Sequence, residues 1–339
     1  MKKSCLLLFL LLSFFVACKK KKGIPDVSHI KVDVSIERFD QDFFRIDTNN
    51  MLTSLQQLSQ KHPGFYDDFM QEILGVNGTN TDPNTILVTK EFLKGYSSIY
   101  DSLQLKYKNT DWLKKELQKA FQFVKYYFPG YKAGKAILFV GPFDAPGVAT
   151  TANGLAIGLQ QFAGKEFSVY QAPEMQELFP LYISRRFSKE YITANCIKAV
   201  ALEIFPDKSA DKPLVEQMIE KGKQWWLLDK LLPATPDSIK TGYTKQQLDW
   251  CKENEGLIWS EIVRNEDLNS LNPIVIQTYI GEGPFTQGFS PEYSPGNIGQ
   301  WIGWQIVKKF VSKNTGMKPE EVMNTEARKI LETAKYKPR

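Results

Sequence analysis

The sequence predicts an α+β fold that is mainly helical, with a small β-sheet inserted before buried central helices. Three observations predict this class. Apolar residues recur at three- and four-residue spacing over most of the chain, as they do in amphipathic helices. One continuous apolar run, residues 136–140, is followed by Gly141-Pro142 and is typical of a buried strand. A later segment, residues 191–205, is apolar almost all round and should form a buried central helix that ends at Pro206.

The N-terminal half of the body begins with a strand pattern and continues with helices. Apolar and polar residues alternate from Ile30 to Glu37, which predicts a half-buried strand over residues 30–39. Helical spacing then covers residues 51–60, 65–74, 85–105 and 111–128. Pro129-Gly130 ends the last of these helices.

The middle of the chain changes to a strand pattern before it returns to helix. Residues 154–162 form a second strand candidate, which we expect to pair with residues 136–140 as a hairpin through the loop 143–153. Thr244 should cap the helix that follows it. The remaining helices are expected over residues 191–205, 213–232, 244–264, 295–311 and 325–334. Because no repeat and no long polar linker interrupts the pattern, residues 29–339 are expected to form a single globular domain.

The first 28 residues carry targeting signals. Lys2 and Lys3 precede an apolar run that is too short to span a membrane, which indicates a secretory signal peptide over residues 1–17. The run ends in Phe15-Val16-Ala17-Cys18, which has the form of a lipobox. Residues 18–28 would then be a lipidated cysteine and a basic tether that attach the protein to a membrane. The alternative is a plain secretory signal with an incidental cysteine.

The charge of the body excludes nucleic acid as a partner. The chain has 43 basic and 38 acidic residues, but six of the lysines lie in the signal peptide and the tether, which leaves a net charge of −1 from Gly23 onward. Such a body lacks the positive surface that nucleic-acid binding needs. The four lysines at 19–22 would favour anionic lipid headgroups or serve as a solvated spacer. No acidic stretch follows Cys18, and its absence favours the periplasmic side over the cell surface.

Histidine usage argues against a metal centre. The chain has two histidines, His29 and His62, and neither has a second histidine at metal-ligand spacing. We expect His62 to be a solvated loop residue. No glycine-rich phosphate loop is present, and the segment at Gly281 and Gly283 is expected to be a turn. The sequence therefore predicts neither a metal nor another cofactor.

Two glutamates are the candidates for catalysis. Glu203 lies near the end of the apolar segment 191–205, and Glu220 lies on the next helix. If those helices pack antiparallel, the two carboxyl groups could approach and act as a general acid and base. The alternative is structural: Glu203 would pair with a buried arginine or lysine, such as Arg185 or Arg186, and Glu220 would be solvated.

The C-terminal segment 295–307 offers a possible binding face. Gly299 and Gly303 lie four residues apart and so share one face of a helix, and Trp301 and Trp304 border it. Such a face permits the close approach of another helix, or it lines an aromatic groove that binds a cell-wall fragment or a peptide. The remaining cysteines, Cys196 and Cys251, could pair, although buried free thiols are the more common state of lone cysteines.

Several segments together resemble a known family. They are residues 29–34, 36–40, 222–223, 232–233, 242–244, 248–251, 254–255, 259, 295–307 and 335–338. On these residues the chain resembles the GldB family of gliding motility lipoproteins. The resemblance implies an envelope lipoprotein that works with other proteins of the gliding apparatus and of the secretion system linked to it.

The GldB family is in turn distantly similar to predicted zinc peptidases, in which a buried helix carries His-Glu-x-x-His and a later helix supplies a glutamate. The corresponding buried helix here, residues 195–205, has no histidine, and Glu220 would stand in the place of the later glutamate. The similarity implies a degenerate zincin-like metallopeptidase scaffold that is kept for binding. We therefore expect a non-catalytic envelope component, with an envelope hydrolase that uses Glu203 and Glu220 as the alternative.

Overall fold

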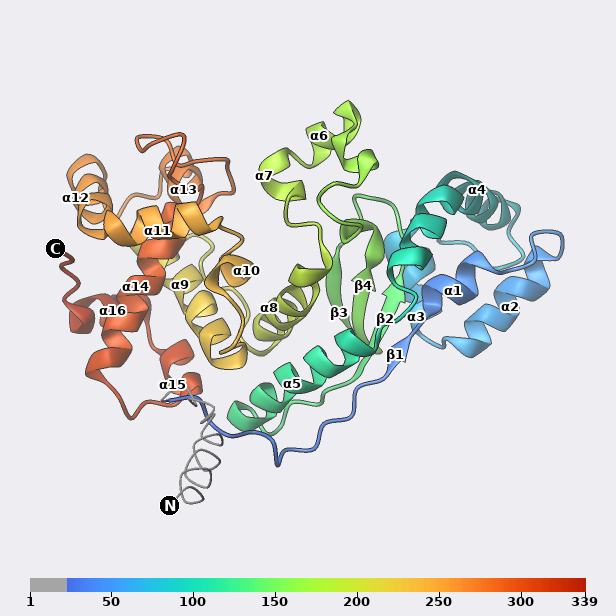
Figure 1. The fold of residues 1–339 in the computed structure, drawn as a ribbon, viewed down its shortest axis with the longest axis horizontal. Coiled ribbons are helices and arrows are strands. Elements are labelled where there is room, and N and C mark those ends of the chain that lie inside the picture. Colours follow the sequence, from blue (N-terminus) through green and yellow to red (C-terminus); the bar gives the residue numbers. More distant parts are fainter. Residues whose placement is uncertain (1–22) are drawn as a thin grey trace, which may run out of the picture.

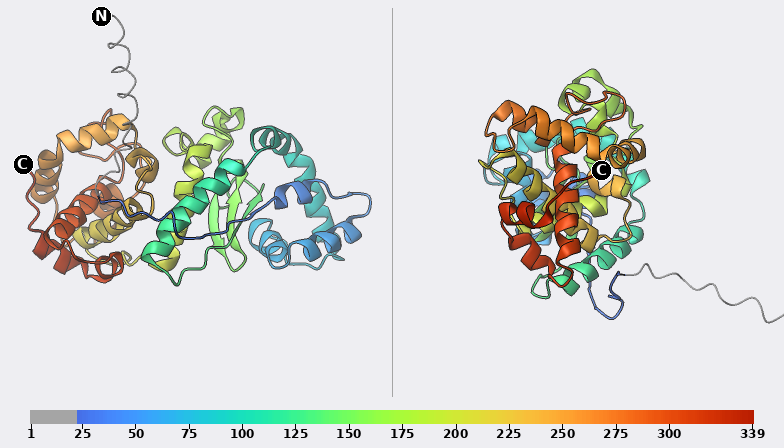
Figure 2. Two further views of the ribbon diagram at one scale, coloured as in Figure 1. Left: turned by 60° about the horizontal axis from the view of Figure 1, so that its bottom comes forward. Right: turned by 90° about the vertical axis from the view of Figure 1, so that its left-hand side faces the viewer.

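The computed structural model describes residues 23–339 (Figure 1) and confirms an α+β fold that is mainly helical. The predicted signal peptide, Cys18 and the lysines of the tether lie outside the described residues. Figures 1 and 2 show an elongated molecule in which a sheet lies between two groups of helices. No helix within the described residues is both long and apolar enough to cross a membrane.

The sheet has four strands in the order β1-β2-β4-β3. β1 (Ile36–Glu37) pairs parallel with β2 (Lys135–Phe139), and β2 pairs parallel with β4 (Gly154–Gly158). β3 (Val148–Thr151) pairs antiparallel with β4 at the edge. The register places Ala136 opposite both Ile36 and Leu155. The two inner strands are therefore the continuous apolar runs, as expected for strands that are covered on both faces.

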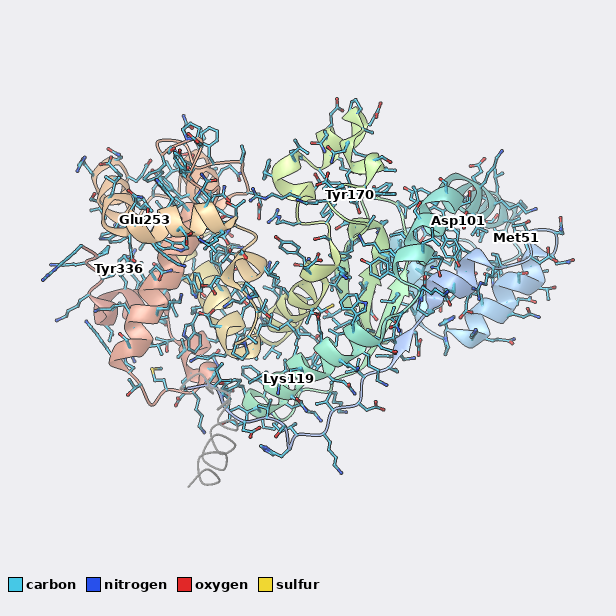
Figure 3. The ribbon with its side chains drawn as sticks, viewed as in Figure 1. Met51, Asp101, Lys119, Tyr170, Glu253 and Tyr336 are labelled. Atoms are coloured by element: carbon cyan, nitrogen blue, oxygen red, sulfur yellow. The ribbon has the colours of Figure 1, made fainter. Side chains whose placement is uncertain are left out.

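The alternation of β2 divides the interior into two cores. Ile137 and Phe139 point toward the N-terminal helices, and Ala136 and Leu138 point toward the rest of the molecule. The N-terminal group comprises α1 (Phe39–Phe44), α2 (Met51–Lys61), α3 (Phe65–Asp68), the π-helical turn Phe69–Ile73 and α4 (Pro83–Lys106). Figure 3 shows Met51 of this group at one end of the molecule and Tyr336 of the larger core at the other.

The larger core is built around three helices. They are α8 (Ile192–Ile204), α9 (Leu214–Leu231) and α14 (Ile298–Lys313), and α5 (Asp111–Tyr127) covers the sheet beside α8. α9 and α14 have the most extensive contact of any two elements. The elements around them are α6 (Pro173–Leu178), α7 (Leu181–Ser184), α10 (Asp237–Thr241), α11 (Lys245–Glu253), α12 (Glu255–Asn265), α13 (Pro273–Ile280), α15 (Pro319–Asn324) and α16 (Ala327–Ala334).

The predicted strand over residues 30–39 is mostly wrong. Only Ile36 and Glu37 pair as a strand, although Val34 is buried and its neighbours are exposed, as the alternation requires. The preceding residues run along α5 (Figure 1), whose Gln122 side chain donates to the carbonyl of Ile30 at 3.0 Å. The Gln122 side chain thus supplies the hydrogen bond that a neighbouring strand would otherwise donate to the Ile30 carbonyl.

The predicted hairpin between residues 136–140 and 154–162 is also wrong, because β2 and β4 are parallel. The loop that we expected between them contains β3, which forms the actual hairpin with β4. A tight turn fixes that hairpin: the hydroxyl of Thr151 donates to the carbonyl of Gly154 at 3.1 Å and accepts from the backbone N–H of Asn153 at 3.0 Å. The turn makes β3 the local partner of β4 and leaves the other edge of β4 for β2.

Two helix boundaries also differ from the sequence prediction. The segment 244–264 forms two helices, α11 and α12, which meet at Asn254. The Asn254 side chain donates to the carbonyl of Trp250 at 2.9 Å and so competes with the helical backbone. α14 begins at Ile298 because Asn297 takes a left-handed backbone conformation with φ of 46°. The predicted Thr244 cap is confirmed, and it forms a capping box with Gln247.

Candidate functional site

The structure gives Glu203 and Glu220 different surroundings. Glu203 is exposed at the end of α8, and its Oε2 accepts a hydrogen bond from the hydroxyl of Tyr131 at 3.0 Å. Glu220 is 5% exposed on α9. Its carboxylate pairs with Lys212 Nζ at 2.9 Å and with Lys223 Nζ at 2.7 Å. Among the described residues, no hydrogen bond or shared partner joins the two glutamates.

Both details of the structural alternative are therefore wrong. Glu203 makes no ion pair with Arg185 or Arg186 among the described contacts, because it lies at the solvent-facing end of α8. Glu220 is buried, because α9 is covered along most of its length, and two lysines neutralise its charge. A carboxylate that is held by two ammonium groups is a structural anion.

The predicted face of Gly299, Trp301, Gly303 and Trp304 is turned inward. Trp301 is 1% exposed and Trp304 is 2% exposed, so neither ring borders an open groove. Gly303 instead meets α9: a Cβ atom on it would lie 1.7 Å from the carbonyl oxygen of Met218. The indole N–H of Trp304 donates to Asp229 at 2.9 Å. This face is therefore the place where α14 crosses α9. Of the two interpretations that the sequence left open, the close approach of another helix is correct and the open aromatic groove is not.

The side chains of His62, Cys196 and Cys251 are buried. His62 is 5% exposed, which contradicts the predicted solvated position: its Nε2 lies 2.8 Å from Asp42 and its ring packs edge-on against Phe39. Cys196 and Cys251 are buried free thiols, and burial raises the pKa of both. In residues 23–339 no three His, Cys, Asp or Glu side chains gather as a metal site would require.

A different place in the molecule has the features of a binding site. A pocket of about 180 Å³ lies between α8, α9 and the segments that precede α8 and α14, and it is partly open to solvent. Lys198 and Ala201 enter it from α8. Lys221, Gln224, Trp225 and Leu228 enter it from α9, because residues three and four apart on a helix share one face. Glu282, Asn297 and Gln300 close the pocket near the start of α14.

Lys198 is the unusual charge of this pocket. It is the one basic residue of α8, and it is half-buried. Burial, together with the positive charge of Arg186, lowers the pKa of Lys198 to about 8, and the opposing charge of Glu282 only partly compensates. Lys198 makes no hydrogen bond or ion pair with any described residue.

The side of the pocket near the start of α14 is held by a polar network. Arg186 pairs with Glu282 at 3.2 Å. Glu282 also accepts a hydrogen bond from the Asn297 side chain at 3.4 Å. The hydroxyl of buried Tyr243 donates to Asn297 Oδ1 at 2.8 Å. These bonds connect three distant segments and fix the positions of the charged groups in the pocket.

Sequence reasoning missed this pocket. The available signal was Lys198 itself. A single cation in an apolar helix requires a compensating partner, as does the carboxylate of Glu203 on the same helix. No sequence pattern connects Lys198 with Glu282 or Gln224, because these residues meet only when α8, α9 and the start of α14 pack together.

The comparisons with known proteins agree with the resemblance seen in the sequence. The family described as gliding motility protein GldB matches residues 20–338, which is nearly the whole chain. No curated protein and no solved structure matches the chain. The match covers the sheet, both cores and the pocket between α8 and α9. The chain therefore belongs to the family of the gliding motility protein GldB.

Proposed function

We propose that the protein is a lipid-anchored, non-catalytic binding component of the gliding apparatus and of the secretion system linked to it. The family match over residues 20–338 carries this proposal. Membership in a gliding motility family supports a partner among the other gliding proteins of the cell envelope. Lipid on Cys18 would supply the membrane attachment, and the protein would face the periplasm.

The N-terminal segment limits how far the body extends from the membrane. Val27 is already fully buried against the body, and it lies nine residues after Cys18. An extended chain spans at most about 3.3–3.6 Å per residue, so the body would stay within roughly 30 Å of the lipid. A short tether suits a component that binds partners close to the membrane surface.

The non-catalytic role is supported by the positions of the candidate acid and base. A paired-carboxylate hydrolase holds both carboxyl groups around one substrate bond. Here Glu203 binds the Tyr131 hydroxyl at the surface, whereas Glu220 is neutralised by two lysines in the interior. The pocket between α8 and α9 has Lys198 and Gln224 in its lining but neither of these glutamates. This arrangement favours binding over hydrolysis.

Colony spreading of a deletion strain tests the proposal. We expect deletion of the gene in its gliding host to abolish spreading on agar, and the native gene to restore it. A gene carrying Glu203→Gln should restore spreading fully, because that side chain is exposed and makes one hydrogen bond. Protein abundance is checked by blotting in every strain. Normal spreading of the deletion strain would refute the gliding role, and lost spreading of Glu203→Gln at normal abundance would refute the non-catalytic role.

Substitution of Cys18 tests the anchor separately. We expect a Cys18→Ser protein to leave the membrane fraction and to restore less than a tenth of native spreading, because a component without its lipid is diluted away from its partners. Cys5→Ser, which lies within the predicted signal peptide, is the matched control and should behave as the native gene does. A Cys18→Ser protein that stays in the membrane fraction would contradict lipidation at this residue.

A further inference from the structure

The charges of the pocket between α8 and α9 leave one cation without a partner. Arg186 pairs with Glu282, and Lys221 pairs with Asp207 at 2.5 Å. Lys198 lies in the same pocket and has no ion-pair partner among the described residues. A half-buried ammonium group without a counter-ion favours the binding of an anion, because the anion restores the charge balance that burial disturbs.

One hydrogen-bond acceptor in the lining also lacks a partner. Gln224 donates through Nε2 to the carbonyl of Phe205 at 2.9 Å, and this bond fixes the orientation of its amide. The other end of the amide, Oε1, is buried and accepts no hydrogen bond from any described residue. Because this atom has almost no accessible surface, a donor that enters the pocket, such as an N–H group, satisfies it through a small shift of the Gln224 side chain.

The size and walls of the pocket limit the ligand. A volume of about 180 Å³ is smaller than the pockets that hold drug-sized molecules, which are about 300–1,000 Å³. The exposed side chain of Leu202 and the ring of Trp225 provide apolar walls. The pocket is partly open, so a longer molecule could continue from it into solvent. These properties fit a single residue with a modest apolar side chain.

We propose that this pocket binds the carboxyl-terminal residue of a peptide, with its carboxylate on Lys198, its amide N–H on the Oε1 atom of Gln224 and its side chain against Trp225. The inference deepens the proposed binding role and rests on it. A free amino acid presents much of the same chemistry, and the experiment separates these two sources.

Three small probes test the chemistry, with purified full-length protein in detergent and isothermal titration. N-acetyl-leucine carries both the carboxylate and the amide N–H. N-acetyl-leucinamide lacks the negative charge, and 4-methylpentanoate lacks the N–H group. We expect N-acetyl-leucine to bind at least tenfold more tightly than either of the others. Equal binding of the amide would overturn the role of Lys198, and equal binding of 4-methylpentanoate would overturn the role of Gln224.

Variants assign the binding to the pocket. Lys198→Met keeps the aliphatic stem and removes the charge, so it should weaken N-acetyl-leucine binding at least tenfold. Gln224→Met should weaken it by a smaller factor and should abolish the advantage over 4-methylpentanoate. Lys309→Met changes an exposed lysine of α14 outside the pocket and should bind as the native protein does. Native melting temperatures show that each variant is folded. Unchanged binding by folded Lys198→Met would overturn the inference.

The affinity should also depend on pH. Lys198, with a pKa of about 8, is about nine-tenths protonated at pH 7 and about one-tenth protonated at pH 9. The carboxylate binds the protonated form, so affinity for N-acetyl-leucine should fall about tenfold between these values. The other charges that face Lys198 are Arg186 and Glu282 from the flanking segments and the pair of Asp207 and Lys221. In Lys198→Met the fall should disappear, and a fall that persists there would contradict the assignment.

One comparison of probes identifies the molecule that supplies the carboxylate. A separate result, the spreading of the deletion strain, tests the gliding role. Tighter binding of N-acetyl-alanyl-leucine than of free leucine would identify a peptide end, and the reverse order would identify a free amino acid and overturn the peptide inference. If no probe binds at millimolar concentration, this inference fails while a deletion strain that does not spread still supports the gliding role. If the probes bind but the deletion strain spreads normally, the gliding role fails and the pocket assignment stands.

Discussion

Replacing Gly303 by alanine is expected to destabilise the protein by about 3 kcal/mol or more, which is the upper range for overpacking a core. The added Cβ would lie 1.7 Å from the Met218 carbonyl oxygen and 2.3 Å from its carbonyl carbon. Both atoms belong to the backbone of α9, so no side chain can move aside to make room. The helices α9 and α14 would have to separate along the contact that forms the centre of the larger core.

Thermal unfolding measures this effect. With an unfolding entropy of about 2.1 cal/mol/K per residue, a loss of about 3 kcal/mol lowers the melting temperature by roughly 4 °C. Gly222→Ala should give a similar loss, because its Cβ would lie 2.2 Å from the carbonyl carbon of Gly303. Gly95→Ala is the matched control: this glycine is exposed within α4, and nothing lies within 4 Å of the added atom. The control should raise stability by about 0.5–1 kcal/mol, as replacing an exposed helical glycine does.

A Gly303→Ala protein as stable as the native one would contradict the direct backbone contact between α9 and α14. The Gly95→Ala control distinguishes this outcome from a general tolerance of helical glycines to substitution.

Replacing Lys223 by methionine is the second large effect that we expect, with a loss of about 3–5 kcal/mol in the free energy of unfolding. Lys223 is 3% exposed, and its Nζ pairs with Glu220 at 2.7 Å. The same Nζ donates to the carbonyls of Met323 and Thr325, each at 3.1 Å, and so connects α9 to the end of α15. Methionine fills a similar volume but leaves Glu220 buried with one half-exposed partner, Lys212, and leaves the two carbonyls without this donor.

Denaturant titration measures this loss, and two further variants test its cause. Lys221→Met breaks an ion pair with Asp207 whose side chains are 30% and 34% exposed, so it should cost no more than about 1 kcal/mol. Adding Glu220→Leu to Lys223→Met should recover part of the loss, because it removes the buried charge that lacks compensation. If Lys223→Met costs no more than Lys221→Met, the buried pair does not hold α9 and α15 together.

The position of Glu220 also affects how the hydrolase alternative is tested. A Glu220→Gln protein would lose a buried charge pair, and its failure in a motility assay would report instability rather than lost chemistry. Glu203→Gln avoids this difficulty because Glu203 is exposed. The exposed glutamate is therefore the informative variant for catalysis, and Glu220 is informative for stability.

Local patterns in the sequence predicted most of the elements. The spacing of apolar residues located α2, α4, α5, α8 and α9 to within a few residues, because a helix that buries one face must repeat its apolar positions at that spacing. Thr244 identified the start of α11, because an N-cap is formed within four residues of chain. The continuous apolar run of β2 correctly indicated a strand that is covered on both faces.

Relations between distant segments could not be predicted from such patterns. The direction of β4 relative to β2 depends on how the intervening chain crosses the sheet, and the apolar pattern of a strand is the same in both directions. The burial of His62 depends on Phe39 and Asp42, which come from α1. The candidate site was the least predictable feature. Lys198, Gln224 and Glu282 lie on three separate segments, and no spacing in the sequence relates them to one another.

The sequence by itself determined the fold class, most of the long helices and the family, because each depends on residues that are close in the chain or on many segments compared together. The tertiary structure decided the meaning of the individual polar residues. A glutamate, a lysine or a glycine becomes a site, a structural ion pair or a helix contact through its neighbours in space. Packing of α8, α9 and α14 determined those neighbours. It enclosed Glu220 with two lysines, placed Gly303 against Met218 and left Lys198 in the pocket without an ion-pair contact to any described residue.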